Sequence, residues 1–240
     1  MNTVEQITEV IKNSDNIVFF GGAGVSTESG IPDFRSVDGL YNQKYDYPPE
    51  TILSHTFYRR KTEEFYRFYR DKMICKDAKP NVIHKALAKL EEEGKVKAVV
   101  TQNIDGLHQM AGSKEVLELH GSVHRNYCES CGKFFDADYI MASKDVPKCD
   151  VKGCDGFVKP DVVLYEEGLN DEIIRKSIEY IRNADVLIVG GTSLAVYPAA
   201  GLIDYYRGNK LILINKSATP KDSAADYFYQ GSLSDVFSKL

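Results

Sequence analysis

The sequence predicts an α/β protein built on a doubly wound parallel sheet. Four short runs, each apolar on both faces and each ending in Gly, Thr or Asn, lie at residues 16–20, 96–100, 185–189 and 210–214. Apolar residues at helical spacing predict helices at about residues 50–73, 80–93, 171–183, 197–207 and 232–240. Strands that are apolar on both faces and alternate with helices indicate a parallel sheet covered on both sides.

The first elements follow the same pattern. Val4, Ile7, Val10 and Ile11 recur at helical spacing over residues 3–12, ahead of the first apolar run. That run stops at glycines, which indicates a buried strand followed by a tight loop. In such sheets ligands bind beyond the carboxyl ends of the strands, so we expect a site built from several loops.

Composition limits the functions that need consideration. With 240 residues and 43% hydrophobic content, the chain is expected to form one main domain that carries a small insert. Lysine and arginine number 30 against 35 acidic residues, a net charge of −5, so sequence-specific binding of nucleic acid is not expected. No apolar stretch suits export or a membrane span, and we expect a cytoplasmic protein with no membrane partner.

The insert at residues 124–157 is rich in Cys, Lys, Asp and Gly and carries two cysteine pairs. Cys128 and Cys131 have two residues between them, and Cys149 and Cys154 follow with four residues between them. Free thiols or a redox pair are the alternatives, but a redox pair would not need a second pair behind it. Four thiolates leave zinc no open coordination position, so the pattern predicts one structural zinc ion.

The loop Gly21-Gly22-Ala23-Gly24 follows the first strand and would let backbone amides approach a phosphate. The dinucleotide pattern G-x-G-x-x-G fails at Thr27, and a bare structural turn is the alternative. The polar continuation to residue 35 is too long for a simple connection. It offers an aromatic lid in Phe34 and a guanidinium for phosphate in Arg35.

Two further strand ends carry polar residues. Gln102, Asn103 and Asp105 follow the second strand, and burying them favours recognition of a carboxamide and a ribose. His120 ends the apolar run 117–119 and meets a loop, a position that favours a general base over a structural histidine.

Several strings in this chain resemble the sirtuins, a family of NAD-dependent protein deacylases. GAGVSTESGIPDFR, TQNIDGLH, LHGS, the two cysteine pairs and GTSLAVYPAA occur in the family's order over nearly the whole chain. The length resembles the compact prokaryotic members. The resemblance implies a Rossmann-like domain at residues 1–123 and 158–240 and a small zinc-binding domain at 124–157. Helices from about 40–75 would join the small domain in space.

The resemblance also implies roles for individual residues. His120 and Asn103 would be catalytic. The residues expected to contact NAD are Gly22, Ala23, Gly24, Thr27, Asp33, Phe34, Arg35, Gln102, Asn103, Ile104, Asp105, His120, Thr192, Ser193, Asn215, Lys216 and Leu233. Val162, Val163 and Tyr165 would pair with the substrate peptide as an added strand, with a simple edge strand as the alternative. The family's usual Phe-Gly-Glu is here Tyr165-Glu166-Glu167.

The implied activity is removal of an acyl group from lysine in proteins or peptides. NAD is the co-substrate, nicotinamide leaves, and the acyl group passes to ADP-ribose. Sirtuins that prefer acidic acyl groups carry Tyr-x-x-Arg where this chain has Tyr66 and Tyr69, so a neutral acyl group is expected, although Arg67 and Arg70 lie one residue away.

Three other functions are weighed against deacylation. Protein ADP-ribosyl transfer would break the same glycosidic bond. A non-catalytic zinc-containing binding module would need neither His120 nor Asn103. Hydride transfer is the weakest alternative, since the acidic ribose-binding residue of dehydrogenases is missing.

Overall fold

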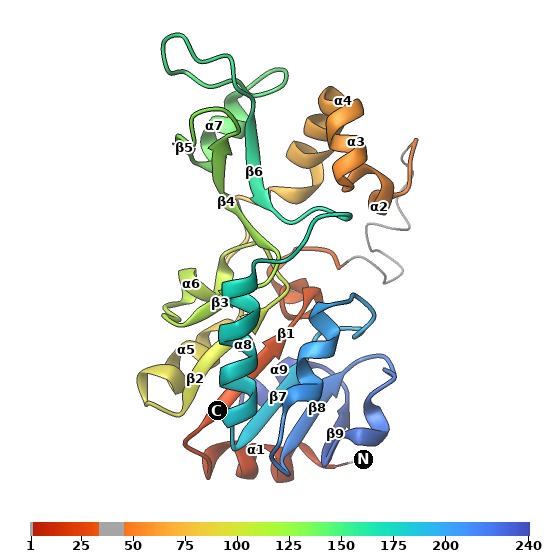
Figure 1. The fold of residues 1–240 in the computed structure, drawn as a ribbon. Coiled ribbons are helices and arrows are strands. Elements are labelled where there is room, and N and C mark those ends of the chain that lie inside the picture. The colour runs from red at the N-terminus through yellow and green to blue at the C-terminus, as the bar shows by residue number, and fades with distance from the viewer. Residues whose placement is uncertain (1, 34–45) are drawn as a thin grey trace.

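A six-stranded parallel sheet forms the centre of the larger unit in the computed structural model, which describes residues 2–33 and 46–240 (Figure 1). In spatial order its strands are β3 (Val116–Glu118), β2 (Val96–Thr101), β1 (Ile17–Gly21), β7 (Val186–Gly190), β8 (Leu211–Asn215) and β9 (Tyr227–Gln230). The chain proceeds from β1 outward to β3, then returns to β7 and proceeds to the other edge. This topology confirms the predicted doubly wound α/β class.

Alternating side chains of the strands fill one core on each face of this sheet. On one face Phe19 packs with α1 (Val4–Lys12), α5 (Val82–Glu92) and α9 (Leu233–Phe237). On the other face Val18 and Phe20 pack with α8 (Asp171–Asn183) and the 3-10 helix Ala199–Tyr205. Because both faces are covered, the central strands β1 and β7 are buried at every residue, as the sequence pattern indicated.

A second, antiparallel sheet lies beyond the carboxyl ends of the large sheet (Figure 1). Its strands are β4 (Gly121–Cys128), β5 (Phe134–Phe135) and β6 (Val158–Val162). Its core also contains side chains from α2 (Pro49–Ile52), α3 (His55–Arg60), α4 (Thr62–Phe68), the π-helical turn Tyr69–Met73 and α7 (Ala137–Ala142). The division into two domains at the expected residue boundaries stays a prediction.

Local details differ from the predicted elements. The helix expected at 50–73 is broken because the Ser54 hydroxyl caps α3, accepting from Phe57 N at 3.1 Å, and because Lys61 leaves helical geometry at φ −135°. The segment expected as a helix at 197–207 is 3-10 helical. Strand β9 and helices α6 (Leu107–Ala111) and α7 were not predicted, since each is short and carries little apolar periodicity.

Candidate active site and metal centre

Hydrogen bonds join the loops that follow β1, β2 and β7 at one edge of the large sheet. Gln102 N donates to Gly21 O at 2.9 Å, and Gln102 Nε2 donates to Thr192 Oγ1 at 3.1 Å. Gly24 N donates to Gly191 O at 2.8 Å. Three of the polar or glycine motifs singled out in the sequence therefore meet in one place.

The glycines after β1 are required by this close approach. A Cβ at Gly22 would lie 2.8 Å from Thr192 Cβ, and one at Gly24 would lie 2.7 Å from Gly191 Cα. The amides of Gly22 and Gly24 donate to the carbonyls of Gly190 and Gly191 at 3.3 and 2.8 Å. These two amides are thus used within the protein, and packing explains the glycines independently of phosphate binding.

The end of β8 is tied to the same loops. Asn215 Nδ2 donates to Thr192 O at 3.0 Å, and Asn215 Oδ1 accepts from Thr192 N at 3.1 Å. Leu233 is buried against Gly190, where a Cβ would lie 2.5 Å from Leu233 Cδ2. Lys216 follows Asn215, and its carbonyl accepts from Gln230 Nε2 at 3.4 Å.

A buried hydrogen-bond network fixes the polar residues after β2. Ser26 Oγ donates to Asp105 Oδ2 at 2.7 Å and accepts from Asn103 Nδ2 at 3.1 Å. Asp105 Oδ1 accepts from Leu107 N at 2.9 Å, in the first turn of α6. Because Asn103 is only 8% exposed, its amide is held in one orientation by these partners.

Two buried histidines extend this network and were not predicted as site residues. His84 Nε2 lies 3.5 Å from Ser26 Oγ, and its ring centroid lies 4.7 Å from that of His108. Neither nitrogen of His108 has a hydrogen-bond partner among the described residues. Burial lowers the pKa of His84 to about 4 and the pKa of His108 to about 3. The pattern Asn81-x-x-His84, which forms the capping box of α5, is the signal that would have pointed to His84.

His120 lies at the corner between the two sheets, after β3 and before β4. Its Nδ1 lies 3.0 Å from the carbonyl oxygen of Gln102, which only accepts hydrogen bonds, so Nδ1 carries the proton and Nε2 carries the lone pair. Burial lowers the pKa of His120, partly opposed by the hydrogen bond to Gln102. The ring is therefore neutral near pH 7.

Other residues expected to contact NAD lie around this edge. Ala23 begins a 3-10 turn after β1, and Thr27 Oγ1 donates to Gly24 O at 3.1 Å. The carbonyl of Ile104 accepts from Val123 N at 3.0 Å. The remaining two with described positions are Asp33 and Ser193, and both have interactions with other residues. Phe34 and Arg35 lie outside the described residues.

The segment expected to receive the peptide runs out of β6 past His120. Val162 pairs with Gly121, and Val163 N donates to His120 O at 3.0 Å. Both backbone groups of Tyr165 are used, since its N–H donates to Leu53 O and its carbonyl accepts from His55 N, each at 2.9 Å. A peptide at this residue would therefore meet the exposed Tyr165 side chain instead of its backbone.

Glu166 stands where the usual Phe-Gly-Glu has glycine, and its backbone adopts a conformation typical of glycine. This residue has φ 75°, the left-handed region that glycine adopts most readily. The Glu166 carboxylate accepts a hydrogen bond from Thr56 N at 2.8 Å, in the first turn of α3. Glutamate thus keeps the turn of the usual glycine and adds a bond to a helix N-terminus.

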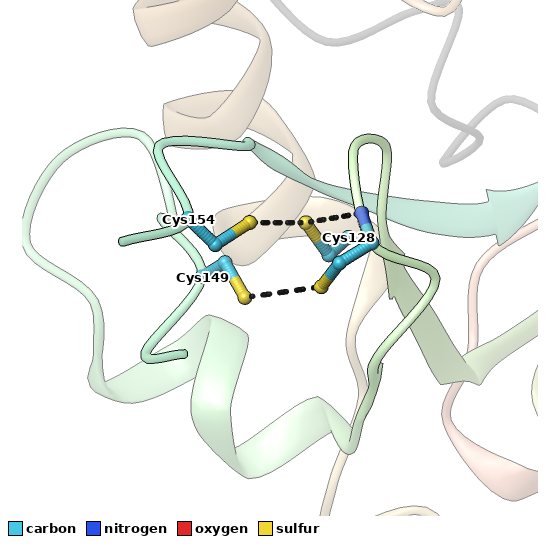
Figure 2. Close-up of side chains that lie close together, drawn as sticks. Cys128, Cys149 and Cys154 are labelled. Carbon is cyan, nitrogen blue, oxygen red and sulfur yellow. Dashed lines mark hydrogen bonds between the residues drawn. The ribbon is translucent and has the colours of Figure 1, made fainter. Parts of the chain in front are cut away.

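The four cysteines form one cluster at the end of β4, whose last residue is Cys128 (Figure 2). The sulfurs of Cys128 and Cys154 are 3.5 Å apart, those of Cys131 and Cys149 are 3.6 Å apart, and all four lie within 4.8 Å of one another. Tetrahedral zinc with Zn–S bonds of about 2.3 Å requires sulfurs about 3.8 Å apart. The donor set therefore fits one structural zinc ion with all four positions filled by protein.

The chain matches the Sir2 family model over residues 22–198. It is 62% identical to an NAD-dependent protein deacetylase of Clostridium acetobutylicum, with 100% of this chain and 98% of that protein covered. The identity to an NAD-dependent protein deacetylase of Cutibacterium acnes is 50%, with 99% and 97% covered. This chain belongs to the Sir2 family.

Solved Sir2 structures share the whole fold of this Sir2-family chain. A complex described as Sir2, p53 peptide and NAD+ has a TM-score of 0.86 at 40% identity, with 99% of this chain and 97% of that chain covered. A Sir2 variant with deacetylated p53 peptide and 3′-O-acetyl ADP-ribose has a TM-score of 0.89 at 39% identity, with the same coverage. The two-sheet arrangement is thus that of the family. Within the described ranges no helix has the length and apolar character needed to cross a bilayer.

We expect the metal to hold the small sheet together. Changing Cys149 to Ser should release zinc and lower the melting temperature, because metal binding supplies folding free energy to a small core. Cys75→Ser is the matched control, since Cys75 is exposed and lies outside the cluster. Metal content by atomic emission and thermal melting test this, and full zinc content in Cys149→Ser would contradict the assignment.

The buried histidines should make the fold sensitive to acid. Their pKa values are about 4 for His84 and about 3 for His108, whereas an unfolded histidine has a pKa of about 6.5. Below pH 6.5 the unfolded chain therefore binds protons that the folded chain does not, and the free energy of unfolding falls as pH drops toward 4. The limiting slope is about 1.4 kcal/mol per pH unit for each histidine.

Urea unfolding at pH 8 and pH 5 measures this loss. His108→Leu should lose less stability than the natural chain between the two pH values, because leucine binds no proton. Equal losses in both proteins would show that His108 does not titrate as its burial requires.

Proposed function

We propose that this chain is an NAD-dependent protein deacetylase that moves an acetyl group from lysine to ADP-ribose and releases nicotinamide. The full-length identity of 62% to a curated deacetylase carries this proposal. The geometry supports it, since a neutral imidazole, a buried amide and a fixed carboxylate gather at one edge of the sheet.

NAD, as co-substrate, supplies the ribose carbon that takes the acyl oxygen when nicotinamide leaves. Asn103 and Asp105 are assigned to the nicotinamide and its ribose, since both are rigidly held beside the Gln102 loop. Thr192, Asn215 and Lys216 are assigned to the adenosine half, at the ends of β7 and β8. These sites lie on opposite sides of Gly22 and Gly24, as the two halves of a dinucleotide require.

His120 is assigned as the general base. Its Nε2 lone pair would take a proton from a ribose hydroxyl, whose oxygen then attacks the acyl carbon. The bond from that carbon to the lysine nitrogen would then break, lysine would leave as the free amine, and water would add to give the acylated ADP-ribose. The hydrogen bond from Nδ1 to Gln102 O holds the ring in the tautomer that this step needs. Burial keeps the imidazole neutral, so the base is ready near pH 7.

The partner is an acyl-lysine side chain in a protein or peptide, as in the Sir2 complexes that hold p53 peptide or a propionylated peptide. The segment from Val162 to Tyr165 is assigned to this peptide, since Val163 N donates to His120 O and Tyr165 is 39% exposed. We place the reaction in the cytoplasm, because the composition suits that compartment and because cysteines stay reduced there and available to bind zinc.

A neutral acyl group suits the residues at the Tyr-x-x-Arg positions. Tyr66 and Tyr69 are fully buried, and Tyr66 Oη donates to Val158 O at 2.5 Å. Arg67 is exposed, and Arg70 donates through Nη1 and Nη2 to the carbonyls of Asp145 and Lys144. Neither arginine replaces the missing partner for an acyl carboxylate, which would therefore be buried unpaired.

Protein ADP-ribosyl transfer remains the second candidate, because it breaks the same bond of NAD. Radiolabelled NAD separates the two reactions. Deacetylation leaves the label on a small acetylated ADP-ribose, whereas transfer leaves it on protein.

The central test follows acetylated peptide and NAD by mass spectrometry. The natural chain should remove acetyl and form one nicotinamide per turnover. His120→Ala should slow turnover by about 10²- to 10⁴-fold, the usual contribution of a general base, with unchanged melting. Undiminished activity in His120→Ala would refute the assignment of His120 as the base, and absence of turnover in the natural chain would favour the non-catalytic module.

Acyl choice is tested with paired peptides. Turnover on acetyl-lysine should exceed turnover on succinyl-lysine by at least about tenfold, since a buried carboxylate without a counter-charge costs several kcal/mol. Tyr69→Arg is the matched variant and should narrow the gap. Faster removal of succinyl by the natural chain would end the proposal for a neutral acyl group.

A further inference from the structure

The corner that carries His120 is spanned by an ion triad centred on Arg125. Arg125 Nη1 lies 2.6 Å from Glu118 Oε2, and Arg125 Nε lies 2.7 Å from Asp161 Oδ2. Glu118 is the last residue of β3 in the large sheet, and Asp161 belongs to β6 in the small sheet. One guanidinium therefore connects the two sheets on either side of residues 119–121.

Arg125 can reach both carboxylates because β4 bulges at this place. Ser122 pairs with Asp161, and the next pair is Asn126 with Pro160, so residues 123–125 have no partner on β6. The bulge also contacts the loop after β2, since Val123 N donates to Ile104 O at 3.0 Å and His124 Nε2 lies 2.9 Å from Asp105 O. Such bulges redirect a strand and the side chains it carries.

The backbone around His120 is held on both sides. Leu119 N donates to Thr101 O at 2.9 Å, and Val163 N donates to His120 O at 3.0 Å. Gly121 turns with φ 75°, and a Cβ there would lie 1.9 Å from Asp161 O. These contacts hold the backbone next to His120, and the Arg125 triad spans the bend between β3 and β4 through side chains.

Burial makes the pair with Glu118 the stronger half of the triad. The Glu118 side chain is 8% exposed, whereas those of Arg125 and Asp161 are 38% and 43% exposed. Removing Arg125 would leave a nearly buried carboxylate without its counter-charge, next to the corner.

We propose that Arg125 is a positioning residue, which fixes the angle between the two sheets and thereby sets His120 Nε2 against the ribose hydroxyls. This inference rests on the proposed deacetylase function. Displacement of a reacting group by about 1 Å costs up to about 100-fold in rate. Release of nicotinamide precedes the proton transfer to His120, so Arg125 acts on the later step.

Arg125→Met tests the proposal, with Arg59→Met as the control. Arg59 forms an ion pair with Glu129 at 3.1 Å in the small unit and has a 56% exposed side chain. Arg125→Met should lower turnover of acetyl peptide about tenfold and keep the KM for NAD within about twofold. Exchange of labelled nicotinamide into NAD should stay within about twofold. Arg59→Met should match the natural chain in all three.

The double variant Glu118→Gln/Arg125→Met separates positioning from stability, because it removes the unpaired carboxylate. The melting temperature of the double variant should be higher than that of Arg125→Met, whereas its turnover should be as low as that of Arg125→Met. Recovery of turnover with stability, an equal fall in nicotinamide exchange, or unchanged turnover in Arg125→Met would each overturn the proposal. If the natural chain itself shows no turnover on acetyl peptide, the proposed function fails instead.

Discussion

The contact between the loop after β1 and the loop after β7 is the constraint on which the site depends. Side chains at Gly22, Gly24 or Gly191 would each collide with the facing loop. Because these residues have none, Gln102 reaches Thr192 across the sheet edge, and the carbonyl of Gln102 in turn meets His120. The positions of the polar residues after β2 and of His120 thus depend on a single backbone frame.

The polar network beneath this frame has both a benefit and a cost. Ser26 is hydrogen-bonded to both Asn103 and Asp105, so the positions of these two side chains are coupled. The histidines behind them are neutral and buried, and His108 has no hydrogen-bond partner in the described part of the chain. A site that is preorganised in this way loses stability in acid, as is common where buried polar groups serve a function.

The fold could be predicted from its strands, because apolar runs such as residues 185–189 indicate strands that are buried on both faces of a parallel sheet. The cysteine cluster was equally readable, since its spacing determines its chemistry. Short elements were missed because β9 and α6 are stabilised by neighbours more than by their own pattern. His84 and His108 were missed because single histidines carry no periodic signal, and the reason for Glu166 in place of glycine required its backbone angle.

Among the passages of the chain between the two units, those from β3 to β4 and from β6 to α8 lie side by side, with Gly121 paired to Val162. Two hydrogen-bonded strands behave as a ribbon, which flexes across its thin dimension far more easily than it shears in its plane. His120 adjoins this ribbon, because its carbonyl accepts from Val163 N at 3.0 Å. A flexing of the ribbon would carry His120 with it, and the triad of Arg125 with Glu118 and Asp161 spans the bend and opposes that movement.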